Sequence, residues 1–238
     1  MKRHPNIVEI FAVSWNLQND SIYPILVMEL ACEEHRTMAE LLSNPTPLET
    51  RLELARDVLE GLSALHGLSV VYGDIKPENT LIFKSISKVG ITAKLSDFGF
   101  CKPSQHSSWE AGGTPYWNAP ECLFGAPENI KTHAYSNGRD IYTFGLLSVY
   151  LLTENKPFSD MDITTISELK LSNQVSTMMS SRWKVVEIDS GKFSERQLKS
   201  GSLFVCPGFP VILSSIKDSS LMWQGVRLCL ACIEREGP

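Results

Sequence analysis

Four polar side chains in two short stretches of this 238-residue sequence are of types that can handle a phosphoryl group. Asp74 and Asn79 lie five residues apart in VVYGDIKPENTLIF, and a second carboxylate follows at Asp97 in SDFGF. Because Mg²⁺ prefers hard oxygen ligands and leaves positions for substrate phosphates, Asn79 and Asp97 are a candidate metal pair that a bound nucleotide would complete. Asp74 is left as a base for a hydroxyl, and Lys76 can neutralise charge on a transferring phosphoryl group.

Short strands are predicted on both sides of these stretches. Two apolar runs that begin at Ile7 and Tyr23 flank the turn-forming NLQNDS, which indicates a β-hairpin. TLIF (80–83) and ITAKLSDFG (91–99) indicate two further short strands, and the Ser, Gly and Pro content from there to Pro120 indicates a long loop. The stretch with Asp74 therefore lies on a loop that precedes a strand.

An amphipathic helix is predicted before that loop. Thr46, Pro47 and Glu49 occupy capping-box positions at the start of TPLETRLELARDVLEGLSALHGL (46–68), and its apolar residues recur on one face. His66 ends this helix, where a histidine near the C-terminal dipole is common and needs no ligand.

The second half of the chain has one clear helical pattern. GRDIYTFGLLSVYLLT (138–153) is apolar almost all round, which is typical of a buried helix. Residues 172–220 are rich in Ser and mixed charge without periodicity, and no regular structure is predicted for them. LMWQGVRLCLACIE (221–234) indicates a last helix.

Composition excludes several classes of function. A formal net charge of −5 provides no basic surface for nucleic acid or an anionic membrane. No signal-peptide pattern or bilayer-length apolar run occurs, so the expected compartment is the cytoplasm, with the nucleus as an alternative. Six cysteines without regular spacing fit a reducing compartment, and Cys229 and Cys232 are expected to be buried helix thiols rather than zinc ligands.

Six ordered motifs resemble those of the eukaryotic protein kinases, mainly their C-terminal lobe. A catalytic loop of the form D-x-x-x-x-N and a D-F-G are part of the family's signature. The resemblance implies an α+β, protein-kinase-like fold with a mostly helical large lobe. In this sequence the motifs are HPNIV (4–8), ILVMEL (25–30), DIKPEN (74–79), DFG (97–99), GTPYWNAPE (113–121) and GRDIYTFG (138–145).

The resemblance also divides the chain. Residues 1–31 would be a two-strand remnant of the small lobe with the hinge, and residues 32–238 would be the large lobe. Within the large lobe, 172–220 is expected to be irregular. In the family, the Glu at the position of Glu121 normally pairs with an Arg near the end of the lobe. By alignment that Arg would fall just past Pro238, so the lobe is expected to be truncated there.

Catalytic roles carry over residue by residue. By resemblance Asp74 is the catalytic base, Lys76 contacts the γ-phosphate and substrate, and Thr114 steadies both. Asn79 and Asp97 hold Mg²⁺.

The nucleotide pocket follows in the same way. Met28 is the gatekeeper, the backbone of Glu29 and Ala31 bonds the adenine edge of ATP, and Leu81 forms the floor of the adenine pocket.

The resemblance implies transfer of the ATP γ-phosphate to serine or threonine hydroxyls of a protein substrate. Thr114 is typical of Ser/Thr-directed members, and Trp117 is similar to the tyrosine-kinase-like group. Tyrosine specificity is the weaker alternative. Asp140 in the predicted buried helix is expected to hold the catalytic-loop backbone, because a buried Asp needs such partners. Substrate identity and oligomeric state are left open.

Two departures bear on mechanism. Family members have His-Arg before the catalytic Asp, where this chain has Tyr72 and Gly73. Without that Arg, ordering of the activation segment by phosphorylation is doubtful, while Tyr72 can keep an aromatic contact with Phe98.

The larger departure is that neither a Gly-rich loop nor a strand Lys precedes the hinge motif. The first expectation is therefore a kinase domain incomplete at both ends. The alternatives are a catalytically weak pseudokinase or interaction module, and a degenerate gene copy without a stable product.

Overall fold

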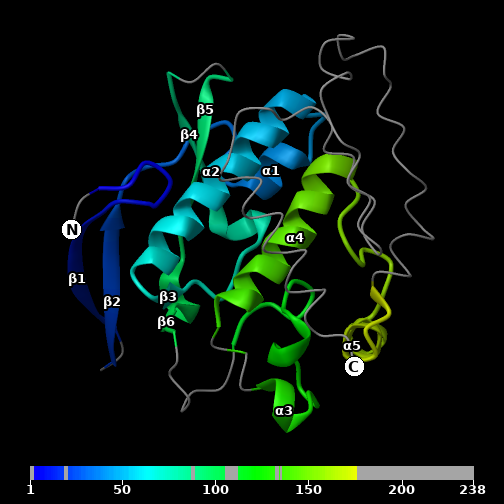
Figure 1. Cartoon of the computed structure of the whole chain (residues 1–238). Helices are drawn as coiled ribbons and strands as arrows, with labels where there is room; N and C mark the ends of the chain where they lie inside the picture. Colours follow the sequence, from blue (N-terminus) through cyan, green and yellow to red (C-terminus); the bar gives the residue numbers. More distant parts are fainter. Residues whose placement is uncertain are drawn as a thin grey trace, which may run out of the picture.

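The computed structural model describes residues 3–18, 21–86, 89–104, 112–131, 134 and 136–175 (Figure 1). The predicted helix at 221–234, Cys229, Cys232 and all but the first residues of the irregular segment lie outside this part of the chain. None of the described helices combines the length and the apolar character required to cross a bilayer.

Two long helices form the centre of the molecule, lying side by side with a β-hairpin standing apart on one side of them (Figure 1). The helices are α1 (Met38–Leu42), α2 (Leu48–Gly67), α3 (Glu128–Lys131), α4 (Asn137–Thr153) and α5 (Ile163–Leu171). The strands are β1 (Ile10–Gln18), β2 (Ser21–Met28), β3 (Val70–Val71), β4 (Thr80–Lys84), β5 (Ile91–Leu95) and β6 (Lys102–Pro103).

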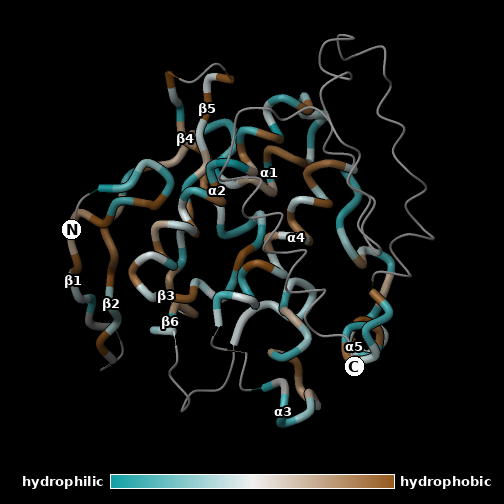
Figure 2. Tube along the Cα trace, viewed as in Figure 1, coloured by the Kyte–Doolittle hydropathy of each residue, from teal (hydrophilic) through white to brown (hydrophobic). Residues whose placement is uncertain are grey.

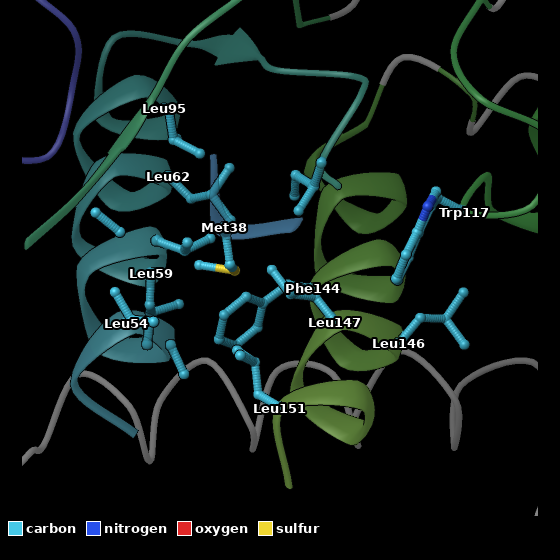
Figure 3. Close-up of a cluster of buried hydrophobic side chains, with 14 of the residues drawn as sticks. Met38, Leu54, Leu59, Leu62, Leu95, Trp117, Phe144, Leu146, Leu147 and Leu151 are labelled. Carbon is cyan, nitrogen blue, oxygen red and sulfur yellow. The ribbon is translucent and has the colours of Figure 1, made fainter. Parts of the chain in front are cut away.

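The hydrophobic core lies between α2 and α4 (Figure 3). Leu54 and Leu62 on α2 face Phe144 and Leu147 on α4, and Met38 of α1 fills the space between them. All five side chains are almost fully removed from water. The predicted amphipathic and buried helices are thus confirmed, and packing against each other explains their apolar faces.

The start of α2 differs from the prediction. Pro47 is the N-cap residue and no side chain caps the helix, so the predicted capping box is wrong. The hydroxyl of Thr46 donates instead to the carbonyl oxygens of Leu41 (3.3 Å) and Asn44 (3.0 Å). Thr46 is therefore used to close the turn after α1, and the carbonyl of Thr46 accepts a bond from Arg51 Nε (2.9 Å).

Three two-stranded antiparallel sheets accompany the helices: β1 with β2, β3 with β6, and β4 with β5. The predicted hairpin and the predicted strand at 80–83 are present, and the strand predicted over 91–99 ends at Leu95, with a short 3₁₀ helix (Phe98–Phe100) after it. The segment up to Pro120 that was expected to be loop contains β6, and the short 3₁₀ helix η3 (Pro120–Cys122) begins at its end. The pairing of β6 with β3 is long-range and has no local sequence signal.

The β1–β2 hairpin exposes apolar side chains. Trp15 and Ile22 are each 67% exposed. Figure 2 colours apolar residues of β1 and β2 brown. In the segment before β1, backbone bonds attach the chain to the large body: Val8 N donates to Leu95 O, and Leu95 N donates to Asn6 O, each at 2.9 Å. The expected small-lobe piece is therefore joined to β5.

We expect Leu147→Ala to lower the free energy of unfolding by about 2–5 kcal/mol, because Leu147 is fully buried between α2 and α4 and truncation leaves a cavity. Leu68→Ala, at a side chain 58% exposed, is the matched control and should change it by less than about 0.5 kcal/mol. Chemical denaturation measures both. Equal effects would show that the core is not where the structure places it.

Candidate functional site

The carboxylate of Asp74 is the centre of the site. It lies in the loop between β3 and β4, is 3% exposed, and accepts bonds from three residues. Lys76 Nζ and Asn79 Nδ2 each lie 2.7 Å from Oδ2, while the backbone N and Oγ1 of Thr114 each lie 2.8 Å from Oδ1. Each of these groups donates a hydrogen bond, so together they hold the Asp74 carboxylate in one orientation, with its oxygens as acceptors.

Thr114 joins two parts of the sequence that lie far apart. Its hydroxyl donates to Asp74 and accepts a bond from Lys76 Nζ at 2.7 Å. Thr114 therefore lies in the position that sequence analysis expected, in contact with both the candidate base and the candidate phosphate-binding lysine.

Asn79 and Asp97 are brought together by the pairing of β4 with β5. Thr80 lies opposite Leu95, and both the backbone N (3.0 Å) and Oγ (2.7 Å) of Ser96 donate to the carbonyl of Asn79. Asp97 follows directly, in a left-handed conformation (φ 51°) with its side chain exposed.

The donor set fits a magnesium ion shared with a nucleotide. Asn79 commits its amide nitrogen to Asp74, so the amide oxygen is turned away from that carboxylate. Asp97 adds an exposed carboxylate, one oxygen of which also accepts from Gly99 N at 3.2 Å. Within the described residues no group of three or more His, Cys, Asp or Glu side chains could enclose a metal. Two oxygen ligands suit Mg²⁺, which takes its remaining ligands from phosphates and water.

Asp140 holds the catalytic-loop backbone, as expected. Its carboxylate, buried in the first turn of α4, accepts from Tyr72 N at 2.7 Å and Gly73 N at 2.8 Å. His66 Nε2, from the last turn of α2, lies 2.8 Å from the same carboxylate. The placement of His66 at a helix end was predicted, but this contact was not, because the two residues are 74 positions apart.

Tyr72 keeps the aromatic contact expected in place of the usual histidine. Its ring meets Phe98 edge to face, with centroids 6.0 Å apart and planes at 82°. The phenol donates to the carbonyl of Ser96. Burial raises the pKa of Tyr72 well above its usual value, so it stays a neutral donor.

The four expected adenine-pocket residues lie on β2, the segment after it, and β4. Glu29 uses its backbone N to bond Glu9 O (3.0 Å), and its carboxylate pairs with Lys94 Nζ (2.7 Å). The resemblance implies only a backbone role for Glu29, and this ion pair was not predicted. Cys32 N donates to Ile82 O at 2.7 Å, which fixes the segment after Ala31 beside β4.

Met28 ends β2, and Leu81 is half-buried in β4, where it forms a bridge with Thr37. The pocket that Met28 and Leu81 would share stays a prediction.

Lys170 and Arg139 are buried basic residues that were not predicted to be buried. Lys170 on α5 is 2% exposed and donates to the carbonyls of Pro115 (3.1 Å), Tyr116 (2.9 Å) and Asn118 (2.6 Å). Arg139 on α4 donates to the carbonyls of three other loop residues, at Gly73, Gly112 and Ala134. A lysine or arginine in a helical pattern is usually a solvated residue, so the sequence carries no signal for either contact.

Comparisons with known proteins identify the family. The family model of the protein kinase domain matches residues 1–202 of the chain. The dual serine/threonine and tyrosine protein kinases of Homo sapiens and Macaca mulatta are each 35% identical to it over 154 residues, which is 63% of this chain and 15% of the relative. The protein of the same name from Gallus gallus is 39% identical over 131 residues, or 55% of this chain and 12% of the relative. The chain thus matches a small part of the length of these relatives.

The buried ammonium of Lys170 should make stability depend on pH. Burial lowers the pKa of Lys170 to about 7, although Cys122 and Glu121 act in the opposite direction. Above pH 7 the unfolded chain, with an ordinary lysine, binds more protons than the folded one, so the free energy of unfolding rises with pH.

Between pH 7 and 8.5 we expect the difference in unfolding free energy between wild type and Lys170→Met to grow by on the order of 1–2 kcal/mol in favour of wild type. Denaturant titrations at several pH values measure this difference. The control is Lys84→Met, at an exposed lysine, which should show a constant difference. A constant difference for Lys170→Met as well would contradict the lowered pKa.

Proposed function

Because this chain belongs to the protein kinase domain family, we propose that it carries the phosphoryl-transfer site of a protein serine/threonine kinase, which uses Mg²⁺ and ATP. The observation that carries the proposal is the Asp74 carboxylate, buried and oriented by Lys76, Asn79 and Thr114. The relatives are named for both serine/threonine and tyrosine activity, so tyrosine acceptors belong in the same test. Residues 1–31 would be the small-lobe and hinge piece and 32–238 the large lobe.

The proposed chemistry assigns one task to each polar group. Asp74 accepts the proton of the substrate hydroxyl as that oxygen attacks the γ-phosphorus of ATP, while the bond from that phosphorus to the β–γ bridging oxygen breaks and ADP leaves. Lys76 stabilises negative charge on the phosphoryl oxygens. Thr114 bonds the side chains of Asp74 and Lys76 and keeps them in position. Since phosphoryl transfer depends mostly on positioning and charge stabilisation, the short bonds around Asp74 are what such a site requires.

Nucleotide binding is assigned to the groups around β4 and β5. The amide oxygen of Asn79 and the carboxylate of Asp97 would hold Mg²⁺, which when bound neutralises charge on the phosphates. The adenine ring would lie against Met28 and Leu81, with its polar edge on the backbone of Glu29 and Ala31. In the described part of the chain the backbone N–H of Ala31 donates to no protein acceptor, which supports this role.

The alternative is a weak pseudokinase or an interaction module, since no G-x-G-x-x-G occurs in the sequence. Retention of Asp74, Lys76, Asn79 and Asp97 favours the kinase, because a docking module needs none of them. Nucleotide binding without transfer would favour the alternative.

We expect Mg²⁺-dependent binding of ATP that Asp97→Asn weakens at least about tenfold, because the variant loses the ligand charge. Isothermal titration with ATP, with and without Mg²⁺, measures the affinity. Glu168→Gln, which removes one exposed carboxylate charge on α5, is the control and should bind as wild type does. Equal affinities for Asp97→Asn and wild type would show that Asp97 is not a metal ligand.

Asp74→Asn should lower turnover by about 10²–10⁴-fold, the contribution typical of a general base, while ATP affinity changes little. Radiolabel transfer to separate serine, threonine and tyrosine peptide pools measures both rate and acceptor. Unchanged turnover would contradict the role of Asp74, and transfer to the tyrosine pool alone would contradict the serine/threonine assignment.

A further inference from the structure

The guanidinium of Arg139 connects the catalytic loop to the segment that carries Thr114. Arg139 lies in the first turn of α4 and is 4% exposed. Its Nη2 lies 2.6 Å from both Gly73 O and Gly112 O, and its Nη1 lies 3.3 Å from Ala134 O. The three acceptors that bond its guanidinium are backbone carbonyls.

Two glycines allow this close approach. Gly73 has φ 85°, and a Cβ there would lie 2.8 Å from Phe100 O. Gly113 has φ 120°, and a Cβ there would lie 2.8 Å from Gly73 O and 3.1 Å from Arg139 Nη2. A side chain is therefore disfavoured at Gly73 and at Gly113. The guanidinium beside Gly73 is supplied by Arg139 of α4.

The contact is close to the reacting groups. Gly112 lies two residues before Thr114, whose N–H and hydroxyl both bond Asp74. Gly73 lies directly before Asp74, and its N–H is held by Asp140 while its carbonyl is held by Arg139. Arg139 and Asp140 are consecutive in α4. They bond the carbonyl and the N–H of Gly73, the residue before the candidate base.

We propose that Arg139 is a positioning residue that holds residues 112–114 on the catalytic loop, so that Thr114 reaches Asp74 without a phosphorylated residue in the activation segment. The proposal rests on the proposed function for its catalytic consequence. If residues 112–114 moved away, the Gly112 bond would be lost and a donor of a buried cation would be left unpaired, which is costly. The assembled arrangement is therefore the favoured one with an unmodified chain.

Lys170 supports the same arrangement from α5. Its bonds to the carbonyls of Pro115, Tyr116 and Asn118 hold the stretch that follows Thr114. The stretch from 112 to 118 is thus attached at both ends to helices of the body by basic side chains that bond its backbone.

Hydrogen exchange at the Thr114 amide tests the positioning role without any need for activity. In phosphatase-treated full chain we expect a protected Thr114 amide, and in Arg139→Met an exchange rate raised about tenfold or more, the effect of losing one charge-assisted bond. Core amides such as Leu147 should change less than about threefold. The control is Arg56→Met, at a half-exposed arginine on α2, which should leave Thr114 protected.

Two results would overturn the positioning role: loss of Thr114 protection in wild type after phosphatase treatment, or unchanged exchange in Arg139→Met. If Arg139→Met does not fold, Arg139→Gln is measured in the same way and decides between the same results.

Kinetics separate this proposal from the proposed function. If the chain transfers phosphate, wild type should keep its turnover within about twofold after phosphatase treatment. Arg139→Met should lose at least about tenfold in kcat, with ATP affinity within about threefold. Transfer only by a phosphorylated chain would overturn the role of Arg139 and leave the kinase assignment intact. Selective exchange at Thr114 without any transfer would support Arg139 and contradict the kinase assignment.

Discussion

One buried carboxylate connects the packing of the two long helices to the geometry of the loop that carries the candidate base. Asp140 is 1% exposed at the start of α4 and receives bonds from Tyr72 N, Gly73 N and His66 on α2. Removing a carboxylate from water is costly unless donors surround it. The packing of α2 on α4 in this register is therefore favourable only when the loop presents these two N–H groups.

Basic side chains of α4 and α5 also hold an irregular segment of backbone, residues 112–118. The stretch from 112 to 118 has few ladder bonds of its own, so its carbonyls must find other partners. Arg139 and Lys170 supply them from α4 and α5. The position of Thr114 thus depends on bonds from α4 and α5 to this segment, and not on the local conformational preference of the segment.

The β1–β2 hairpin shows the opposite situation. Its apolar side chains are exposed, and it is joined to the body through backbone bonds at Asn6, Val8 and Leu95 and through the ion pair of Glu29 with Lys94. Regions with little buried apolar surface open most easily. Three of the four residues assigned to the adenine ring, Met28, Glu29 and Ala31, lie at the end of β2 or directly after it. This part of the proposed nucleotide site therefore has less support than the part around Asp74.

Local patterns in the sequence predicted the two long helices and four of the strands, and they pointed to the candidate reactive groups. Periodicity and apolar runs predicted α2, α4, the hairpin strands, β4 and β5, while α1, α3, α5, β3 and β6 were not predicted. Spacing within VVYGDIKPENTLIF and SDFGF singled out Asp74, Lys76, Asn79 and Asp97 as candidates. The family and the α+β fold followed from these motifs and are confirmed. The capping box at Thr46 failed because its hydroxyl bonds the preceding turn.

Only the tertiary structure decided how the groups are held. It brought His66 to Asp140 and Lys94 to Glu29, across separations that no local pattern records. It also placed Arg139 and Lys170 in the interior. Their partners are backbone carbonyls, which every residue has, so no choice of side chains in the sequence marks where such a cation will bind.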